Sequence, residues 1–412
     1  MSRAPILATG RKHWLAVGAV SAVCAVAVGG AVLTANIHAA DLVQEHLPTS
    51  DEVQVLAQAP NTLTPTLSLP NQPVPGVVRP VVAHGLLITS DGDTVSATHP
   101  DGTRAWHYER SDAPLCSLGT AWGRVVATYR TGVGCGDVVA IDAQTGQYAH
   151  TRSAINSAEV SAINSNDRIG TVSPERAELW RSDLVRTVEY GYVEAKQEPK
   201  KQPHEDCVLG SALTRKETFA ITETCEGDDQ TTWLRLLDAT PEDSRAPEVD
   251  ADVEISSPGV RLVAIGQEAA AVYVPGPQPQ IRSFSKTGAE LAASDVPASP
   301  AAEHPASPFV PATADLPHHM TWFDGERLHL LSPTRLSVEH TIEQAIGTGV
   351  AVGERLLAPT RDGIAVIDWS TGDIERTIPV DRQDYTGPVY LAMAGTSIVE
   401  ARGNELVVLS AS

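Results

Sequence analysis

Short runs of β-branched and aliphatic residues, separated by turn-forming residues, follow one another along most of the chain. One phrase recurs, in which an apolar run ends in Asp and a Thr-Gly turn, at Ile141–Gly146 and again at Ile367–Gly372. Looser copies of the turn lie at Asp101-Gly102 and Thr287-Gly288. Glycine at the end of such a turn supplies the positive φ that a tight hairpin requires. The pattern therefore predicts consecutive β-hairpins.

The turns are spaced as repeated units would be. Gly102 and Gly146 lie 44 residues apart, Gly146 and Gly288 lie 142 apart, and Gly288 and Gly372 lie 84 apart. The long gaps correspond to three and two units, so degenerate turns are expected near Asp183, Asp238 and Pro333. A second signal, an apolar strand that ends in a small residue or a turn, opens eight units, near Val81, Leu115, Val160, Cys207, Arg261, Met320, Val350 and Val389. Four short antiparallel strands repeated radially predict an all-β fold, a β-propeller of eight blades, with seven as the alternative.

The last unit is incomplete, because the chain ends shortly after the apolar run Leu406–Leu409. An earlier segment must supply its outer strand, since an unpaired sheet edge would otherwise remain at the ring junction. Val53–Ala59 is the expected closing strand.

Four of the five cysteines form a second repeat. The segments Cys116–Ala121 and Cys207–Ala212 match at four positions and lie 91 residues apart, which is two units. Cys135 follows the first after 19 residues, and Cys225 follows the second after 18. Of the three possible connectivities, only Cys116–Cys135 with Cys207–Cys225 treats both units alike. We therefore expect these two disulfides, with four buried free thiols as the alternative. The chain contains no CxxC spacing, so a metal-binding or catalytic role of the cysteines is not favoured.

The N-terminal region carries 24 consecutive uncharged residues, Trp14–Ile37. As a helix this run would span about 36 Å, which is enough to cross a bilayer. Arg3, Arg11 and Lys12 precede it, so the positive-inside rule places the N-terminus in the cytoplasm and the following domain outside. A cleaved signal peptide is the alternative, although its apolar region is usually shorter. Disulfides agree with an oxidising, extracytoplasmic compartment.

This reading divides the chain into four parts. Residues 1–13 form a short cytoplasmic tail, 14–37 a transmembrane signal-anchor helix, 38–76 a proline-rich spacer, and 77–412 the propeller ectodomain. Proline-rich stretches favour extended, semi-rigid conformations. Two insertions are expected to be solvated loops without regular structure: Pro297–Pro308, and Glu194–His204, which is the one basic stretch on an acidic domain.

Charge restricts the partners. The formal charge is −21, so the ectodomain repels nucleic acid and anionic headgroups, and basic or neutral partners are favoured. We therefore expect no nucleic-acid binding, and contact with the membrane through the N-terminal helix alone.

Catalytic and ligand-binding motifs are weak. Ser283–Lys286 fits an S-x-x-K pattern but spans a strand and a turn, and Gly347–Gly353 resembles a dinucleotide loop with a misplaced third glycine. His318-His319 is the one cluster of soft metal ligands, yet adjacent side chains on a strand point to opposite faces. No catalytic, cofactor-binding or metal-binding residue is therefore assigned.

Three segments carry a family resemblance: the phrase at 138–146, the first-unit ending at 101–106, and the phrase at 365–372. They resemble the blade motif of quinoprotein-type (PQQ-like) propellers. The whole chain is similar to a membrane-anchored propeller family of mycobacteria and corynebacteria of unassigned function. Quinoprotein dehydrogenases hold their cofactor against a disulfide between adjacent cysteines, which this chain lacks, so the resemblance implies no cofactor. The resemblance implies a fold and a cellular location. The nearer analogues are the non-catalytic propellers that act as scaffolds in envelope protein assembly.

The functional expectation is a non-enzymatic, membrane-anchored extracytoplasmic propeller that binds or scaffolds envelope proteins. The alternative is an enzyme or small-ligand-binding protein that uses the central channel. That alternative predicts convergent polar groups at a channel mouth.

Overall fold

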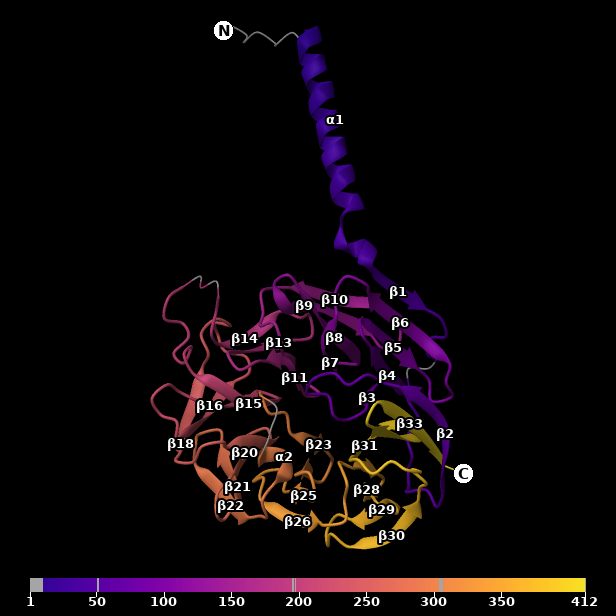
Figure 1. The fold of residues 1–412 in the computed structure, drawn as a ribbon, viewed down its shortest axis with the longest axis vertical. Helices are drawn as coiled ribbons and strands as arrows, with labels where there is room; N and C mark the ends of the chain where they lie inside the picture. The colour runs from indigo at the N-terminus through magenta and orange to yellow at the C-terminus, as the bar shows by residue number, and fades with distance from the viewer. Residues whose placement is uncertain (1–9, 50–51, 195, 197, 304–306, 412) are drawn as a thin grey trace, which may run out of the picture.

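The chain folds into a closed ring of antiparallel sheets from which one helix projects (Figure 1). The computed structural model describes residues 10–49, 52–194, 196, 198–303 and 307–411. Within these residues the strands form eight sheets, which we call blades 1 to 8. Blade 1 comprises β3 (Val81–Ala83), β4 (Leu86–Asp91), β5 (Thr94–Thr98) and β6 (Arg104–Arg110), and blade 2 comprises β7 (Leu115–Ala121), β8 (Arg124–Thr131), β9 (Gly134–Asp142) and β10 (Tyr148–Ser153). Blade 3 comprises β11 (Ser161–Asn164), β12 (Ile169–Val172), β13 (Arg176–Trp180) and β14 (Arg186–Gly191), and blade 4 comprises β15 (Val208–Arg215), β16 (Thr218–Thr224), β17 (Thr232–Asp238) and β18 (Val249–Ile255). Blade 5 comprises β19 (Arg261–Ile265), β20 (Ala269–Val274), β21 (Gln280–Ser285) and β22 (Glu290–Asp295), and blade 6 comprises β23 (Ala312–Asp315), β24 (Met320–Phe323), β25 (Leu328–Leu331) and β26 (Val338–Ile342). Blade 7 comprises β27 (Val350–Val352), β28 (Arg355–Thr360), β29 (Gly363–Asp368) and β30 (Ile374–Pro379), and blade 8 contains β31 (Val389–Ala394), β32 (Ser397–Arg402) and β33 (Glu405–Ala411).

The eight-bladed prediction is confirmed, and the recurrent Thr-Gly turns occupy equivalent places. Gly146, Gly288 and Gly372 each lie between the third and fourth strands of a blade. One blade opening was misplaced, because Met320 begins the second strand of blade 6 and its first strand is β23. The first strands of the blades lie at the centre of the ring, where most of them contact the first strands of both neighbouring blades.

The strand that closes the ring is β2 (Leu63–Pro70), which pairs with β33 from Leu63 opposite Ala411 to Pro70 opposite Glu405. The expectation that Val53–Ala59 would close it is wrong. That segment passes beside turns of the ring, where Val53 approaches Gly85 and Ala57 approaches Gly353. Two prolines are tolerated in β2 because it is an edge strand, and the register shift between Pro65 and Leu67 absorbs the first of them.

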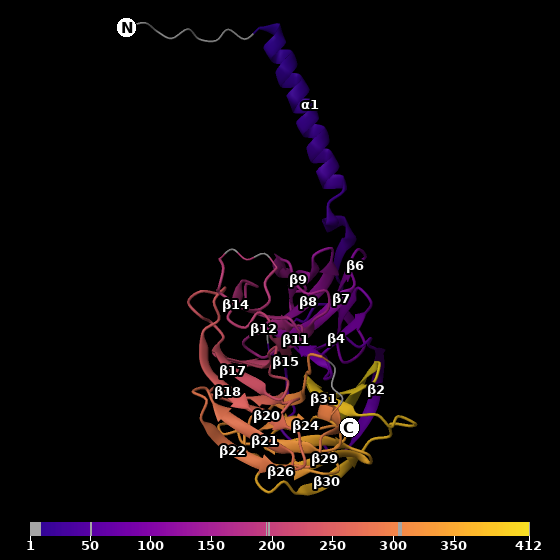
Figure 2. The ribbon, with the colours of Figure 1, turned by 60° about the vertical axis from the view of Figure 1, so that its left-hand side comes forward.

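A second N-terminal strand, β1 (Ala40–Gln44), adds a fifth strand to blade 1 by pairing with β6. It follows α1 (Arg11–Leu33) almost directly, through the short 3-10 turn η1 (Asn36–Ala39). Residues 38–76 are therefore not a spacer, because they supply outer strands to two blades. In Figures 1 and 2, α1 leaves the rim of the ring beside blade 1.

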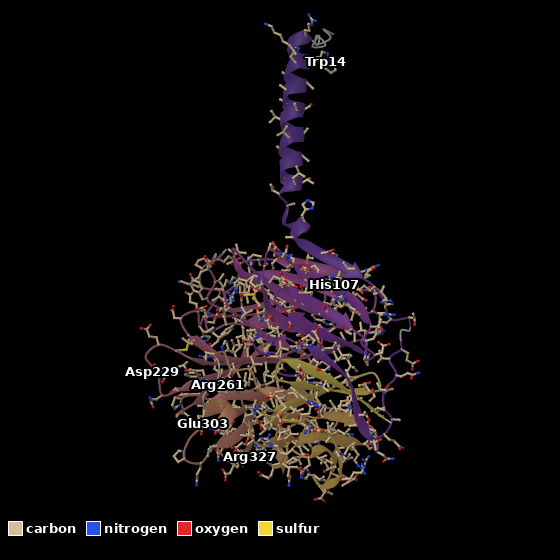
Figure 3. All side chains as sticks on the ribbon, turned by 45° about the vertical axis from the view of Figure 1, so that its right-hand side comes forward. Trp14, His107, Asp229, Arg261, Glu303 and Arg327 are labelled. Atoms are coloured by element: carbon tan, nitrogen blue, oxygen red, sulfur yellow. A yellow bond between two sulfur atoms is a disulfide. The ribbon has the colours of Figure 1, made fainter. Side chains whose placement is uncertain are left out.

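α1 is apolar from Trp14 onward and has no buried residue. Its 23 residues span about 34 Å, and it is long and apolar enough to cross a membrane or to serve as a signal sequence. Trp14 lies at the end of α1 far from the ring (Figure 3). The described part of the expected 1–13 tail begins only at residue 10.

The ring has two faces, which differ in the loops that they carry. We call upper the face with the connections between successive blades and the turns between second and third strands. The lower face carries the remaining turns, including those at Gly146 and Gly372. The two faces meet through the centre of the ring, where the first strands of the blades surround a channel.

Two segments cross this channel from above. The first runs from Val74 to Pro80, and Gly76 needs its glycine there: its φ is 77°, and an added Cβ would lie 3.1 Å from both Ser161 Cβ and Val310 Cγ2. The second is the connection between blades 5 and 6, where the backbone N–H of Phe309 donates to the Gly210 carbonyl of blade 4 at 2.8 Å. The expected loop at 297–308 is partly regular, since it contains α2 (Pro300–Glu303), and residues 304–306 lie outside the described part.

Both predicted disulfides are present, Cys116–Cys135 in blade 2 and Cys207–Cys225 in blade 4. Each bridge ties the start of a blade's first strand to the region after its second strand, on the upper face. The free cysteine of the described chain is Cys24, which lies on α1.

Candidate functional site: an upper groove and a lower channel mouth

The larger hollow of the ring lies on the upper face and has a volume of about 820 Å³. We call it the upper groove. Loops of blades 6, 7 and 8 surround it, together with the two segments that cross the channel. Its apolar lining consists of Pro75, Val78, Ala301, Pro308, Phe309, Val310, Ala312, Phe323, Ala345, Ile346, Pro388 and Tyr390. Such a concave surface, apolar with few charged groups, is typical of a binding site.

The rim of the upper groove is acidic. Glu326, Glu343 and Asp362 are exposed there, against one cation, Arg361, whose guanidinium donates to the Thr386 carbonyl. Glu326 is paired with Arg327 at 2.9 Å, which leaves Glu343 and Asp362 without an ion pair among the described residues. The rim therefore favours a partner that carries positive charge next to an apolar segment.

Apolar side chains are also exposed on the upper face over blades 2 to 4. Val133 and Ile155 lie in upper loops of blade 2, and Tyr192 and Val208 flank the connection between blades 3 and 4. Tyr192 is 50% exposed and Val208 is 56% exposed. The upper face thus combines a groove with further apolar contact area, as protein-interaction surfaces often do.

A second hollow of about 520 Å³ opens at the lower mouth of the channel, and we call it the lower cavity. First strands from seven blades contribute to its wall, and the crossing segment 76–80 lies against it. In contrast to the upper groove it is strongly polar. Its polar lining consists of Arg79, Thr120, Asn164, Ser165, Asn166, Asp167, Thr214, Arg215, Lys216, Thr313 and Asp315.

Ion pairs organise most of the charge in the lower cavity. Arg215 Nη1 lies 2.9 Å from Asp315 Oδ1, and Lys216 Nζ lies 3.0 Å from Asp167 Oδ1. Burial raises the pKa of the Asp315 carboxyl, against the opposing effect of Arg215. Polar groups thus converge at a channel mouth, which is the arrangement expected of a small-ligand binder. The described lining residues of both hollows include neither His nor Cys.

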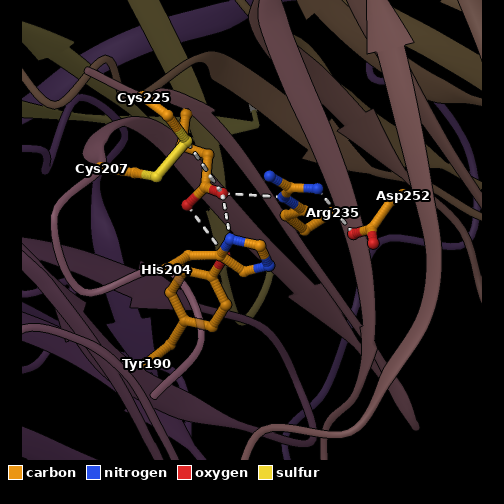
Figure 4. Close-up of a disulfide and its surroundings, with 7 residues drawn as sticks. Tyr190, His204, Cys207, Cys225, Arg235 and Asp252 are labelled. Carbon is orange, nitrogen blue, oxygen red and sulfur yellow. Dashed lines mark hydrogen bonds and ion pairs between the residues drawn. A yellow bond between two sulfur atoms is a disulfide. The ribbon is translucent and has the colours of Figure 1, made fainter. Parts of the chain in front are cut away.

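A buried polar cluster surrounds the Cys207–Cys225 bridge (Figure 4). Glu223 accepts hydrogen bonds from Arg235 Nε at 2.7 Å and from the Tyr190 hydroxyl at 2.8 Å, and His204 Nδ1 lies 3.9 Å from it. Burial raises the pKa of Tyr190. His204, Cys207 and Glu223 are close enough to share a metal ion, but the sulfur of Cys207 is bonded to Cys225 and Arg235 neutralises Glu223. The cluster therefore has a structural role, because it links the segments around the disulfide.

The structure separates the weak sequence candidates from both hollows. His319 Nε2 lies 2.8 Å from Glu339, and its ring stacks on Trp369, whereas His318 approaches Glu354. Ser283 is buried in β21, and Lys286 in the following turn is paired with Asp250. His318 and His319 precede β24 outside a strand, and both rings contact Trp369, so the expected opposite orientation on a strand is wrong. None of these candidate residues lines either hollow.

The expected basic loop at 194–204 is largely neutralised. Lys196 is paired with Glu205, and Lys201 lies 3.2 Å from Asp243. Gln202 is buried and donates to the carbonyls of Glu189 and Arg245 at 2.9 Å. Residues 195 and 197 lie outside the described part.

Neither a protein-family model nor a curated protein matches the sequence. Among solved structures, BamB from Moraxella catarrhalis is similar over 85% of this chain and 100% of that chain, with a TM-score of 0.50 and 14% identity. The β-propeller domain of Cps50 (Swd1) from Myceliophteria thermophila also matches 85% of this chain and 100% of its own length, with a TM-score of 0.44 and 12% identity. At such identities the first match shows a β-propeller fold, and the second adds no argument.

Proposed function

We propose that the protein is a membrane-anchored, extracytoplasmic binding module that holds a protein segment in its upper groove. The observation that carries this proposal is the chemistry of the groove, an apolar hollow of about 820 Å³ with unpaired Glu343 and Asp362 at its rim. Its partner presents apolar side chains next to Lys or Arg. The proposed role is recognition and scaffolding without catalysis.

The anchor and the compartment rest on three features. α1 is long and apolar enough to cross a bilayer, basic residues lie before it and in its first turn, and two disulfides follow it. Positive residues favour the cytoplasmic side, and disulfides persist in oxidising compartments. We therefore place α1 in the cell membrane as a single uncleaved span, with the N-terminus in the cytoplasm and the ring outside, in the cell envelope.

The short connection between α1 and β1 limits how far the ring can lie from the membrane. Only residues 34–39 separate the helix from a strand that is paired with blade 1. The ring is therefore held close to the membrane, and its orientation is set by the pairing of β1. A partner that reaches the upper groove is itself within or next to the same membrane.

The experiment is in-cell crosslinking of the full anchored chain, followed by affinity capture and mass spectrometry. We compare the wild type with E343K/D362K, which reverses both unpaired rim charges without touching a buried side chain. The matched control is E242K/D373K, because both of its acidic residues are exposed in turns of the lower face.

We expect a partner that the wild type and the control capture equally and that E343K/D362K loses. Equal capture by all three proteins would refute the groove as the binding site. Capture by the isolated anchor, residues 1–39, of the same partner at the same level would refute recognition by the ring.

A further inference from the structure

The lower cavity contains a cation that the fold does not neutralise. Arg79 comes from the segment that crosses the channel and lines the cavity from above. Its Nη2 donates to the Leu391 carbonyl at 3.1 Å, and its buried Nε has no hydrogen-bond partner. Among the described residues no carboxylate forms an ion pair with it. A guanidinium carries five N–H hydrogens, so most of its donor capacity is unused.

Arg79 nevertheless remains charged at neutral pH. Burial lowers its pKa to about 10, and the nearby Asp315 carboxylate opposes that effect. Arg79 is half-buried by surface area and its Nε is buried, so an unpaired donor there is costly unless an acceptor reaches it. Arg215 and Lys216 do not share this condition, because Asp315 and Asp167 pair with them at 2.9 and 3.0 Å.

The cavity as a whole is a local exception to the charge of the chain. Three cations and two carboxylates line it, whereas the formal charge of the chain is −21. Asn164, Asn166 and Thr313 add neutral hydrogen-bonding groups around the same hollow. A concave site with one surplus positive charge and neutral polar walls selects small anions over cations.

We propose that the lower cavity binds a small organic or inorganic oxyanion, whose carboxylate or phosphate group accepts hydrogen bonds from the guanidinium of Arg79. Guanidinium groups match the planar carboxylate and the phosphate in geometry as well as charge. The volume of about 520 Å³ leaves room for a ligand body of several non-hydrogen atoms beyond the anionic group. This site is separate from the upper groove and does not depend on the protein partner proposed for it.

Isothermal titration calorimetry of the full chain in detergent micelles tests the proposal with two probes, inorganic phosphate and the dicarboxylate succinate. R79Q removes the charge and most of the donors, and we expect it to weaken binding by about tenfold or more. D315N removes a negative charge near Arg79 and releases Arg215 from its ion pair, so the cavity becomes more positive and we expect binding to tighten. A gain in affinity cannot arise from misfolding, so the two variants together separate recognition from structural damage.

R130Q is the matched control, since it removes an exposed arginine of blade 2 that lines neither hollow and should leave the affinity unchanged. Binding of either probe with these opposite effects supports the site, and the preferred probe identifies the ligand as a carboxylate or a phosphate. No binding of either probe to the wild type or to D315N at millimolar concentration overturns the proposal. Binding that R79Q leaves intact overturns it as well.

Discussion

Removal of the two disulfides is the perturbation whose energetic cost follows most simply from the structure. Cys116–Cys135 closes a loop of 19 residues, and Cys207–Cys225 closes one of 18. In the chain-entropy account, each crosslink of this length stabilises the folded state by about 3 kcal/mol, because it restricts the unfolded chain. The two loops are nearly equal, so replacing either pair by alanine should lower the free energy of unfolding by nearly the same amount.

The bridges lie in blades 2 and 4, which do not share a sheet. Their effects should therefore add, and the variant without both bridges should lose about 6 kcal/mol. The measurement is urea unfolding of the full chain in detergent micelles, followed by tryptophan fluorescence. The reporters are favourable, because Trp106, Trp180 and Trp322 are fully buried.

The wild type with reductant should match the variant without bridges. C24A is the control, since Cys24 lies exposed on α1 and takes no part in either bridge. Identical midpoints for the oxidised and reduced wild type would refute both bridges. A loss confined to one pair would refute the equivalence of the two blades.

Three further predictions concern the ring. E400Q should lower the free energy of unfolding in urea by about 3–5 kcal/mol, because the buried Glu400 carboxylate compensates the charges of Arg382 at 2.7 Å and of Arg402 Nε at 2.7 Å. E375Q, which breaks an exposed ion pair, should cost less than about 1 kcal/mol. Equal costs for the two variants would contradict this prediction. Burial raises the pKa of Asp324, but hydrogen bonds from His329 and from the N–H groups of Glu326 and Arg327 outweigh it and hold that pKa below the usual 3.8. Its stabilising effect is present above pH 3.8 and is lost as the pH falls through the lowered pKa, so the stability gap between wild type and D324N should shrink below about pH 4, and a constant gap would argue against the shift. Deletion of 63–70 removes the closing strand and exposes the edge of β33, so limited proteolysis should cut blade 8 first; cutting in the wild-type order would contradict closure by β2.

The sequence predicted the ring because its evidence was local. The Asp and Thr-Gly turns at Gly146 and Gly372 specify hairpins through backbone conformation alone, and their spacing counts blades. The cysteine pairs were likewise predictable, because each pair bridges fewer than 20 residues within one blade.

The closing strand was misplaced because the proline-rich segment that contains it was interpreted as a spacer. Pro65 and Pro70 argue against a strand in general, yet β2 is an outer strand whose other edge has no partner among the described sheets. Val53–Ala59 has the better apolar pattern, but an apolar pattern cannot identify which of two segments lies beside β33. The pairing of β1 with β6 runs from Ala40 opposite Arg110 to Gln44 opposite Trp106, so it joins residues 62 to 70 positions apart, and no local signal marks it.

Neither hollow was predictable from the sequence, because their walls come from many blades. The upper groove joins Val78 to Phe309 and Tyr390, and the lower cavity joins Arg79 to Asp167 and Asp315. Arg79 lies just after the proline-rich stretch 38–76 that reads as a spacer, and only the course of the chain through the channel places it beside charged first strands. A lone arginine before an apolar strand carries no signal of its own.

Site-specific photocrosslinking from the upper groove is the most direct test of the central claim. A photoreactive residue at Gln344, which is exposed and lines the groove, is compared in cells with one at Gln147, an exposed residue in a lower turn of blade 2. The account predicts a covalent adduct with one protein from Gln344, absent from Gln147 and lost when E343K/D362K is added. An adduct of the same protein from both positions, or none from Gln344, would contradict it.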